Sequence, residues 1–192
     1  MLNDYPVILA DPPWHFQNWN GQPGALTPGM QKRGNAQSHY PTMSIDEICG
    51  LHIPAAKDSV LFLWACWPLL PEAMRVIEAW GFEYKTIAWV WTKLNKNSMA
   101  FYFGMGYYTR ANSEPCLLAT RGNLPKPTAR DVQALICSPI REHSRKPDEQ
   151  YAKIERLYPC GPYLEMFARR TRPGWHVWGN EVKNDVDIRS NT

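Results

Sequence analysis

The stretch VILADPPW at residues 7–14 decides the fold, because it joins a run of strand-forming apolar residues to a rigid polar turn. Its two prolines remove two backbone N–H donors and fix φ near about −65°, so they end the strand and leave carbonyl oxygens as hydrogen-bond acceptors. With the Asp11 carboxylate and the Trp14 ring, these carbonyls complement the N–H donors and flat ring of a nucleobase amine. The same residues also fit a strand terminator followed by a core tryptophan, and the rest of the chain decides between the two interpretations.

The composition is that of one globular domain. The chain has 192 residues, of which 44% are hydrophobic and 20% charged, which is enough for a sizeable core. Lys and Arg number 21 against 18 Asp and Glu, so the net charge of +3 permits an anionic partner without requiring one. We expect a single domain over residues 1–182 and a flexible C-terminal tail over residues 183–192.

Cysteine spacing and the N-terminus indicate where the protein works. The five cysteines lie at least 17 residues apart, without a C-x-x-C pair or a histidine set at zinc-ligand spacing. This pattern predicts buried free thiols in a reducing compartment and no metal site. The chain has no signal-peptide pattern and no apolar run of about 18 residues, so we expect no membrane contact and a cytoplasmic protein, or a nuclear one in a eukaryote.

Strand and helix patterns alternate along the chain. Short runs rich in Val, Ile, Phe and Trp predict buried strands at 6–10, 59–65, 85–92, 115–120, 163–168 and 175–178. Helical periodicity predicts helices over 71–80 and 147–158, and the sequence SIDE at 44–47 has the capping-box spacing of a short helix. The alternation predicts an α/β domain with a mostly parallel central sheet flanked by helices.

Three long connections interrupt this pattern. The first, 15–38, is rich in Gly, Asn, Gln and Pro, and its length suggests a functional loop that could close over a site. The second, 93–113, interleaves Lys and Arg with five aromatic residues, which suits either base stacking or capping of the core. The third, 121–146, carries six Lys and Arg against two acidic residues and is the stronger candidate for nucleic-acid contact.

Two segments near the C-terminus have the chemistry of a nucleoside site. The strand that includes EMFAR at 165–169 ends in a polar turn, and GNE at 179–181 ends the next strand. An acidic residue in such a place can accept hydrogen bonds from ribose hydroxyls, and Glu181 is so placed. The segment 165–169 contains no glycine, so the usual fingerprint of a dinucleotide site is missing.

The order of these motifs carries a resemblance. DPPW at 11–14, HSRKPDE at 143–149, EMFAR at 165–169 and GNE at 179–181 resemble the permuted amino-methyltransferases, and more closely the MT-A70 family of adenine N6-methyltransferases. The similarity extends to HYPTMS at 39–44, LFLW at 61–64, EAWGF at 78–82, IAWV at 87–90 and EPCL at 114–117. It implies a Rossmann-like methyltransferase fold that uses S-adenosyl-L-methionine to methylate adenine N6 in nucleic acid.

The resemblance also implies roles for individual residues. The catalytic motif is Asp11, Pro12, Pro13 and Trp14, in which Asp11 and the Pro12 carbonyl polarise the amine and Trp14 holds the base plane. The cofactor contacts are Lys146, which approaches the cofactor carboxylate, and Phe167, Arg169, Asn180 and Glu181. Tyr40 and Glu114 match positions near the acceptor base, and Glu114 also fits a purely structural role. The charge of the third connection, and not the resemblance, adds Arg121, Lys126 and Arg130 as expected substrate contacts.

Other functions stay open from the sequence alone. The acceptor geometry also suits another planar amine, such as cytosine N4 or a glutamine side chain. A catalytically silent scaffold subunit that binds nucleic acid is a further alternative, against which the intact Asp11 argues. By analogy with prokaryotic and phage members, the compact chain favours DNA over RNA, and both a homodimer and a partner subunit remain open.

Overall fold

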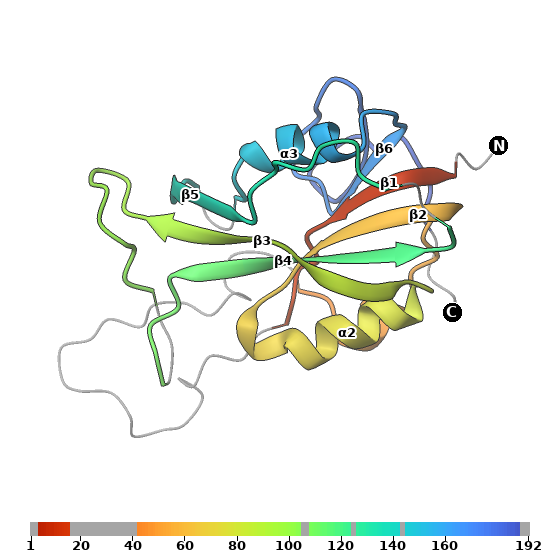
Figure 1. Ribbon diagram of the computed structural model, residues 1–192. Helices are drawn as coiled ribbons and strands as arrows, with labels where there is room; N and C mark the ends of the chain where they lie inside the picture. The colour runs from red at the N-terminus through yellow and green to blue at the C-terminus, as the bar shows by residue number, and fades with distance from the viewer. Residues whose placement is uncertain (1–3, 16–41, 105–107, 124–125, 143–144, 189–192) are drawn as a thin grey trace.

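A computed structural model of the chain describes residues 4–15, 42–104, 108–123, 126–142 and 145–188 (Figure 1). In these residues the chain forms a seven-stranded sheet in the order β5-β3-β4-β2-β1-β6-β7. The strands are β1 (Tyr5–Ala10), β2 (Ala55–Trp64), β3 (Glu83–Leu94), β4 (Ser113–Arg121), β5 (Leu135–Pro139), β6 (Tyr163–Met166) and β7 (Trp175–Trp178). The helices are α1 (Ile45–Cys49), α2 (Leu70–Ala79) and α3 (Glu149–Leu157), with a 3-10 helix η3 (Trp67–Leu69) before α2.

The predicted α/β architecture is confirmed. Each of the six expected strands and three expected helices forms, and the capping box of Ser44 and Glu47 opens α1. β1 pairs in parallel with β2 and β6, β6 with β7, and β3 with β5, whereas β4 pairs antiparallel with both β2 and β3. The sheet is therefore mostly parallel, and β4 alone among the described strands runs against the others. As a result, β4 begins at the edge where its neighbours end.

The strand β5 lies inside the stretch 121–146, which the sequence predicts to be a connection. β5 is five residues long and pairs with β3 at the border of the sheet. Because an edge strand is covered less than a central one, its apolar pattern is weak, and Leu135 is exposed. The third connection is thus divided into two shorter ones.

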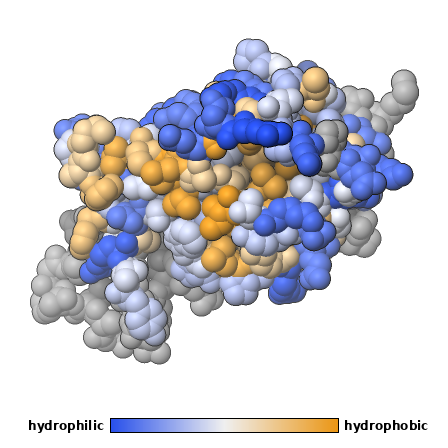
Figure 2. Space-filling view, viewed as in Figure 1, coloured by the Kyte–Doolittle hydropathy of each residue, from blue (hydrophilic) through white to orange (hydrophobic). Residues whose placement is uncertain are grey.

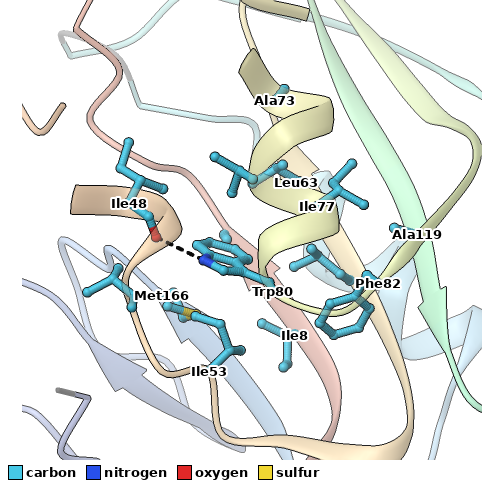
Figure 3. Packing of buried hydrophobic residues seen from close by; sticks show 14 of the residues in the cluster. Ile8, Ile48, Ile53, Leu63, Ala73, Ile77, Trp80, Phe82, Ala119 and Met166 are labelled. Carbon is cyan, nitrogen blue, oxygen red and sulfur yellow. Dashed lines mark hydrogen bonds between the residues drawn. The ribbon is translucent and has the colours of Figure 1, made fainter. Parts of the chain in front are cut away.

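Helices cover both faces of the sheet (Figure 1). On one face Ile77 of α2 and Trp80, which directly follows this helix, pack in one cluster with Ile8 and Leu63. The Trp80 indole donates a hydrogen bond of 2.9 Å to the Ile48 carbonyl (Figure 3). On the other face Ile154 of α3 belongs to a second buried cluster with strand residues. Burial on both faces explains why the central strands are continuous apolar runs.

Replacement of Ile77 by alanine is expected to lower the free energy of unfolding by about 2–5 kcal/mol. The Ile77 side chain is only 2% exposed, so truncation leaves a cavity between α2 and the sheet. Urea denaturation measures the loss. The matched control is Glu78→Ala on the exposed side of the same helix, and an equal loss in both variants would contradict the packing described.

The domain continues beyond residue 182, where the sequence predicts a flexible tail. The backbone N–H of Asp185 donates to the Val177 carbonyl at 2.9 Å, and the Asp185 carboxylate accepts from the Val177 N–H at 2.9 Å. Ile188 is buried in the core. These contacts make residues 183–188 part of the folded domain.

The cysteine prediction is partly wrong. All five cysteines are free, as expected, and Cys116 is buried, but Cys137 and Cys160 are exposed. Cys137 lies on the edge strand β5, and Cys160 lies in the turn before β6, so neither is covered by a second layer. None of the helices in the described residues is long and apolar enough to cross a bilayer.

Candidate active site

The strand β1 occupies the topological switch point of the sheet. Its chain continues into the strand on one side, β2, whereas β6, on its other side, comes much later in the sequence. Ligands of open α/β sheets bind at the carboxyl ends of strands at such a point. Asp11 directly follows β1, and its N–H donates to the Met166 carbonyl at the end of β6 at 3.5 Å.

The prolines shape the turn after β1 as the sequence predicts. The Pro12 carbonyl accepts a hydrogen bond from the Trp14 N–H at 2.8 Å, and the Pro13 carbonyl accepts one from the Met43 N–H at 3.1 Å. A carbonyl oxygen has two lone pairs, so Pro12 keeps one for a further donor. The turn is tied to the segment that leads into α1.

Trp14 lies in the core. Its side chain is 6% exposed, and its indole N–H donates to the Trp64 carbonyl at 3.0 Å. Trp14 therefore anchors the turn as a core residue, as the strand-terminator interpretation predicts. Asp11 faces the site, as the amine-binding interpretation predicts. A role of Trp14 in holding a base plane stays a prediction.

Asp11 belongs to a network of four charged side chains. The Lys146 ammonium contacts the two Asp11 oxygens at 2.7 and 2.8 Å, and it lies 3.4 Å from a Glu114 oxygen. Glu114 also pairs closely with Lys93. The network contains two cations and two anions, and it joins the end of β1, the end of β3, the start of β4 and the segment before α3.

Burial and mutual attraction set the ionisation of this network. Burial raises the pKa of Asp11, and the Lys146 charge opposes this without cancelling it. Burial also acts to raise the pKa of Glu114, but the two lysines outweigh it and the pKa is lowered. Burial disfavours the charged form of Lys146, yet the two carboxylates dominate and raise its pKa. Lys146 is thus cationic, Glu114 is held as its carboxylate, and Asp11 takes up a proton more readily than an exposed aspartate.

Several groups fix the position of Lys146. The Arg141 guanidinium donates to the Lys146 carbonyl at 2.7 Å and pairs with Asp148 at 2.6 Å. The ammonium lies 5.4 Å from the centre of the Trp64 ring, and the Trp64 indole donates to buried Gln150 at 2.7 Å. The aromatic ring and the backbone contacts hold the lysine beside Asp11.

A cavity of about 280 Å³ adjoins the network. Its lining includes Asp11, Lys146, Glu165, Phe167, Arg169 and Glu181. Arg169 and Glu181 form an ion pair of 2.8 Å, whereas Asn180 is exposed beside them and does not line the cavity. The cavity therefore presents cationic, anionic and aromatic groups together.

Close backbone packing shapes this cavity. A side chain at Gly179 would place its Cβ 2.1 Å from the Ala168 carbonyl oxygen, so only glycine allows the turns after β6 and β7 to meet. Phe167 has φ +62°, a left-handed conformation that is rare for a residue with a side chain. Its ring packs edge-on against Trp178 at 5.3 Å. The expected glycine-free segment 165–169 thus makes its turn with a strained aromatic residue.

Glu165 places an unusual carboxyl group in the cavity. The Tyr151 hydroxyl donates to both of its carboxylate oxygens, with O–O distances of 3.0 and 3.1 Å. Burial raises the pKa of Glu165 to about 7, with the Tyr151 hydrogen bond opposing the shift. The carboxyl group therefore titrates near neutral pH.

Replacement of Glu165 by glutamine is expected to stabilise the protein at pH 8. Between the ordinary pKa of 4.5 and the raised pKa of about 7 the folded chain keeps a proton that the unfolded chain has lost. Folding stability therefore falls as the pH rises through this range, and the variant lacks that fall. Allowing for partial exposure, the gain at pH 8 is on the order of 2 kcal/mol. Urea denaturation at pH 5 and pH 8 measures it, and the same gain in the exposed control Glu149→Gln would contradict the assignment.

The three basic residues predicted to contact nucleic acid, Arg121, Lys126 and Arg130, lie away from Asp11, and their contact with a substrate stays a prediction. Arg121 pairs with Ser59, at the edge where the parallel strands begin, because β4 runs antiparallel. Thr128, between Lys126 and Arg130, bonds to the end of α3 at Leu157, away from Lys146. Tyr40 and the loop residues 16–38 lie outside the described residues.

Three side chains at the site have no role assigned from the sequence. Lys93 is expected to start a basic connection, but β3 extends to Leu94 and the lysine is 17% exposed beside Glu114. Trp64 and Glu165 lie within motifs that match the family, yet only their contacts show that one lies under Lys146 and the other faces the cavity. Trp64 and Lys93 lie at the carboxyl ends of predicted strands, which was the signal available, whereas Glu165 lies inside the predicted strand 163–168.

The chain is similar in sequence to several known proteins. The family model MT-A70 matches residues 5–181. The type II methyltransferase M.MunI of Mycoplasma sp is 34% identical in an alignment of 196 positions. The alignment covers 96% of this chain and 81% of that protein. An N(6)-adenosine-methyltransferase MT-A70-like protein of Arabidopsis thaliana is 30% identical over 95% of this chain and 24% of its own length. The human N(6)-adenosine-methyltransferase catalytic subunit METTL3 is 28% identical over 95% of this chain and 29% of its own length.

These matches confirm the resemblance inferred from motif order. The chain spans most of the bacterial relative but less than a third of the plant and human ones.

Proposed function

Since the chain belongs to the MT-A70 family and shares its S-adenosyl-L-methionine-dependent adenine methylation, we propose that it methylates adenine N6 in DNA, with Asp11 addressing the amine. The observation that carries the proposal is the Asp11 carboxylate at the switch point, beside a cavity with charged walls. Our choice of DNA follows the type II methyltransferase M.MunI, which is 34% identical and matched over 81% of its length, whereas the N(6)-adenosine-methyltransferase METTL3 is 28% identical and matched over 29% of its length.

The cavity residues fit the cofactor. Lys146 and Arg169 offer donors to a carboxylate, Glu165 offers an acceptor to an ammonium group, and Glu181 offers acceptors to ribose hydroxyls. S-adenosyl-L-methionine supplies an electrophilic methyl group when bound.

The amine of adenine is a poor nucleophile because its lone pair is delocalised into the ring. We propose that Asp11 and the free lone pair of the Pro12 carbonyl accept its two N–H groups, so that the nitrogen becomes pyramidal and its lone pair leaves conjugation with the ring. As the N–CH3 bond forms and the S–CH3 bond of the bound cofactor would break, positive charge develops on the nitrogen and is stabilised by the Asp11 carboxylate. One N–H proton then leaves to that carboxylate or to water. No covalent intermediate with the protein is needed.

Lys146 has to share Asp11 with the arriving amine. The ammonium lies within reach of Glu114 as well, and Glu114 is held as a carboxylate by Lys93. As the amine takes up the Asp11 oxygens, Lys146 keeps a carboxylate partner in Glu114. Glu114 thereby allows Asp11 to bind the amine while the buried Lys146 ammonium keeps a carboxylate partner.

The target base has to leave its stack to reach Asp11. For a duplex this costs a few kcal/mol, and a single strand avoids most of that cost. Single-stranded DNA is therefore the better first substrate in an assay.

Incubation with labelled S-adenosyl-L-methionine and separate DNA and RNA strands, followed by mass spectrometry of the nucleosides, tests the function. Labelled N6-methyldeoxyadenosine is expected from DNA. Label only in RNA adenosine would overturn the DNA assignment, and label in N4-methylcytosine would overturn the choice of base. Cofactor binding without any transfer would indicate a scaffold subunit.

A further inference from the structure

The connection between β3 and β4 exposes an unusual group of apolar side chains. Met99 is 79% exposed, Phe101 66%, Phe103 74% and Tyr108 93%. Figure 2 shows hydrophobic side chains at the end of the molecule where β3 ends. Large side chains exposed together in this way mark a binding surface. We call Phe101 and Phe103, together with Met99 two positions before Phe101, the aromatic tip.

The aromatic tip is anchored at the active-site edge through Lys93. The Lys93 carbonyl accepts from the Tyr102 N–H at 2.8 Å, and its own N–H donates to the Asn112 carbonyl at 2.8 Å. Gly104 packs so closely on Ala111 that a Cβ would lie 1.8 Å from the Ala111 oxygen. The same Lys93 extends its side chain to Glu114 in the charge network. One residue thus ties both arms of the connection to the group that surrounds Asp11.

Charge favours an anionic occupant for this surface. Residues 95–112 contain Lys96 and Arg110 but no Asp or Glu. The Arg110 guanidinium lies 5.1 Å from the centre of the Phe103 ring. Aromatic faces interleaved with cations, without a carboxylate, match a nucleic-acid strand, whose bases stack and whose phosphates are negative.

We propose that Phe101 and Phe103 stack unpaired bases next to the target adenine, with Lys96 and Arg110 near the phosphates. This inference rests on the proposed function for the identity of the strand. The occupant is a single strand, because a duplex hides its base faces inside the stack and presents phosphates and base edges instead. The aromatic tip would then supply affinity without sequence preference, since every base has a π face.

The test uses the full chain and single-stranded DNA of about 13 nucleotides with one central adenine. The double variant Phe101→Ala/Phe103→Ala is expected to raise KM and the dissociation constant for this strand about 10-fold or more. Strands with abasic sites flanking the adenine should bind wild type as weakly as the intact strand binds the variant, and should show no further loss with the variant. Tyr84→Ala, which removes an exposed aromatic at the start of β3, is the matched control and should change neither constant.

Three outcomes would overturn the proposal. One is an unchanged dissociation constant of the double variant for the intact strand. A second is that the double substitution weakens binding of the abasic strand as much as it weakens binding of the intact strand. The third is a change of oligomeric state in the variant, seen by sedimentation, which would make the tip a protein interface. Fluorescence anisotropy reads strand binding without methyl transfer, so a chain that binds through the tip but methylates nothing would refute the proposed function alone.

Discussion

Replacement of Asp11 by alanine is expected to lower methyl transfer by roughly 10²–10³-fold or more while S-adenosyl-L-methionine binding stays measurable. The carboxylate is the anion that ends β1 at the switch point, and it is the acceptor proposed for the adenine amine. Arg169, Glu165 and Glu181 line the rest of the cavity and remain in place. Single-turnover transfer and calorimetric titration of the cofactor measure the two quantities separately.

A second variant, Asp11→Asn, separates charge from shape. The amide keeps one acceptor oxygen in the same place but adds a donor and removes the negative charge. Transfer should fall nearly as far as in the alanine variant, since stabilisation of the developing positive charge is lost in both. Turnover near the wild-type value in either variant would refute the mechanism. Near-UV circular dichroism checks that Lys146, left with Glu114 as its remaining carboxylate, has not disturbed the fold.

Local chemistry made most of the fold readable from sequence. The apolar run before Asp11, the Ser44 capping box and the periodicity of 71–80 are each dictated by neighbouring residues, and each predicted element forms. The direction of β4 and the existence of β5 are different, because they depend on which strand lies beside which. A five-residue edge strand with an exposed Leu135 has almost no local signal.

The same distinction holds for the site. Asp11 and Lys146 lie 135 positions apart in the sequence, and motif order alone placed both at the site. The links from Glu114 to Lys93 and Lys146 come from the antiparallel course of β4, which brings its first residues to the carboxyl ends of β2 and β3. The same reversal carries Arg121 to the opposite edge. The number of charged residues in a connection does not show that Lys93 lies at the site whereas Arg121 lies at the opposite edge of the sheet.

Replacement of Lys146 by alanine is expected to weaken S-adenosyl-L-methionine binding roughly 10-fold or more and to shift the pH dependence of transfer. The first effect follows from loss of a charge-assisted hydrogen bond to the cofactor carboxylate. The second follows from Asp11, whose pKa is raised by burial and held down by Lys146. Without the lysine the pKa of Asp11 rises further, so the carboxyl group is protonated at higher pH. Since a protonated Asp11 is a poorer acceptor for the amine, kcat/KM should decline at a higher pH than in wild type.

These two readouts distinguish the roles that Lys146 could have. A lysine that serves only the cofactor would change Kd and leave the acid limb of kcat/KM where it was, once the cofactor is saturating. A lysine that serves only Asp11 would move the acid limb and leave the calorimetric Kd unchanged, which would remove Lys146 from the cofactor site. Its contacts with Asp11 at 2.7 and 2.8 Å, on the wall of the same cavity, predict both changes together. The control Lys57→Ala removes an exposed cation from the opposite edge of the sheet and should produce neither.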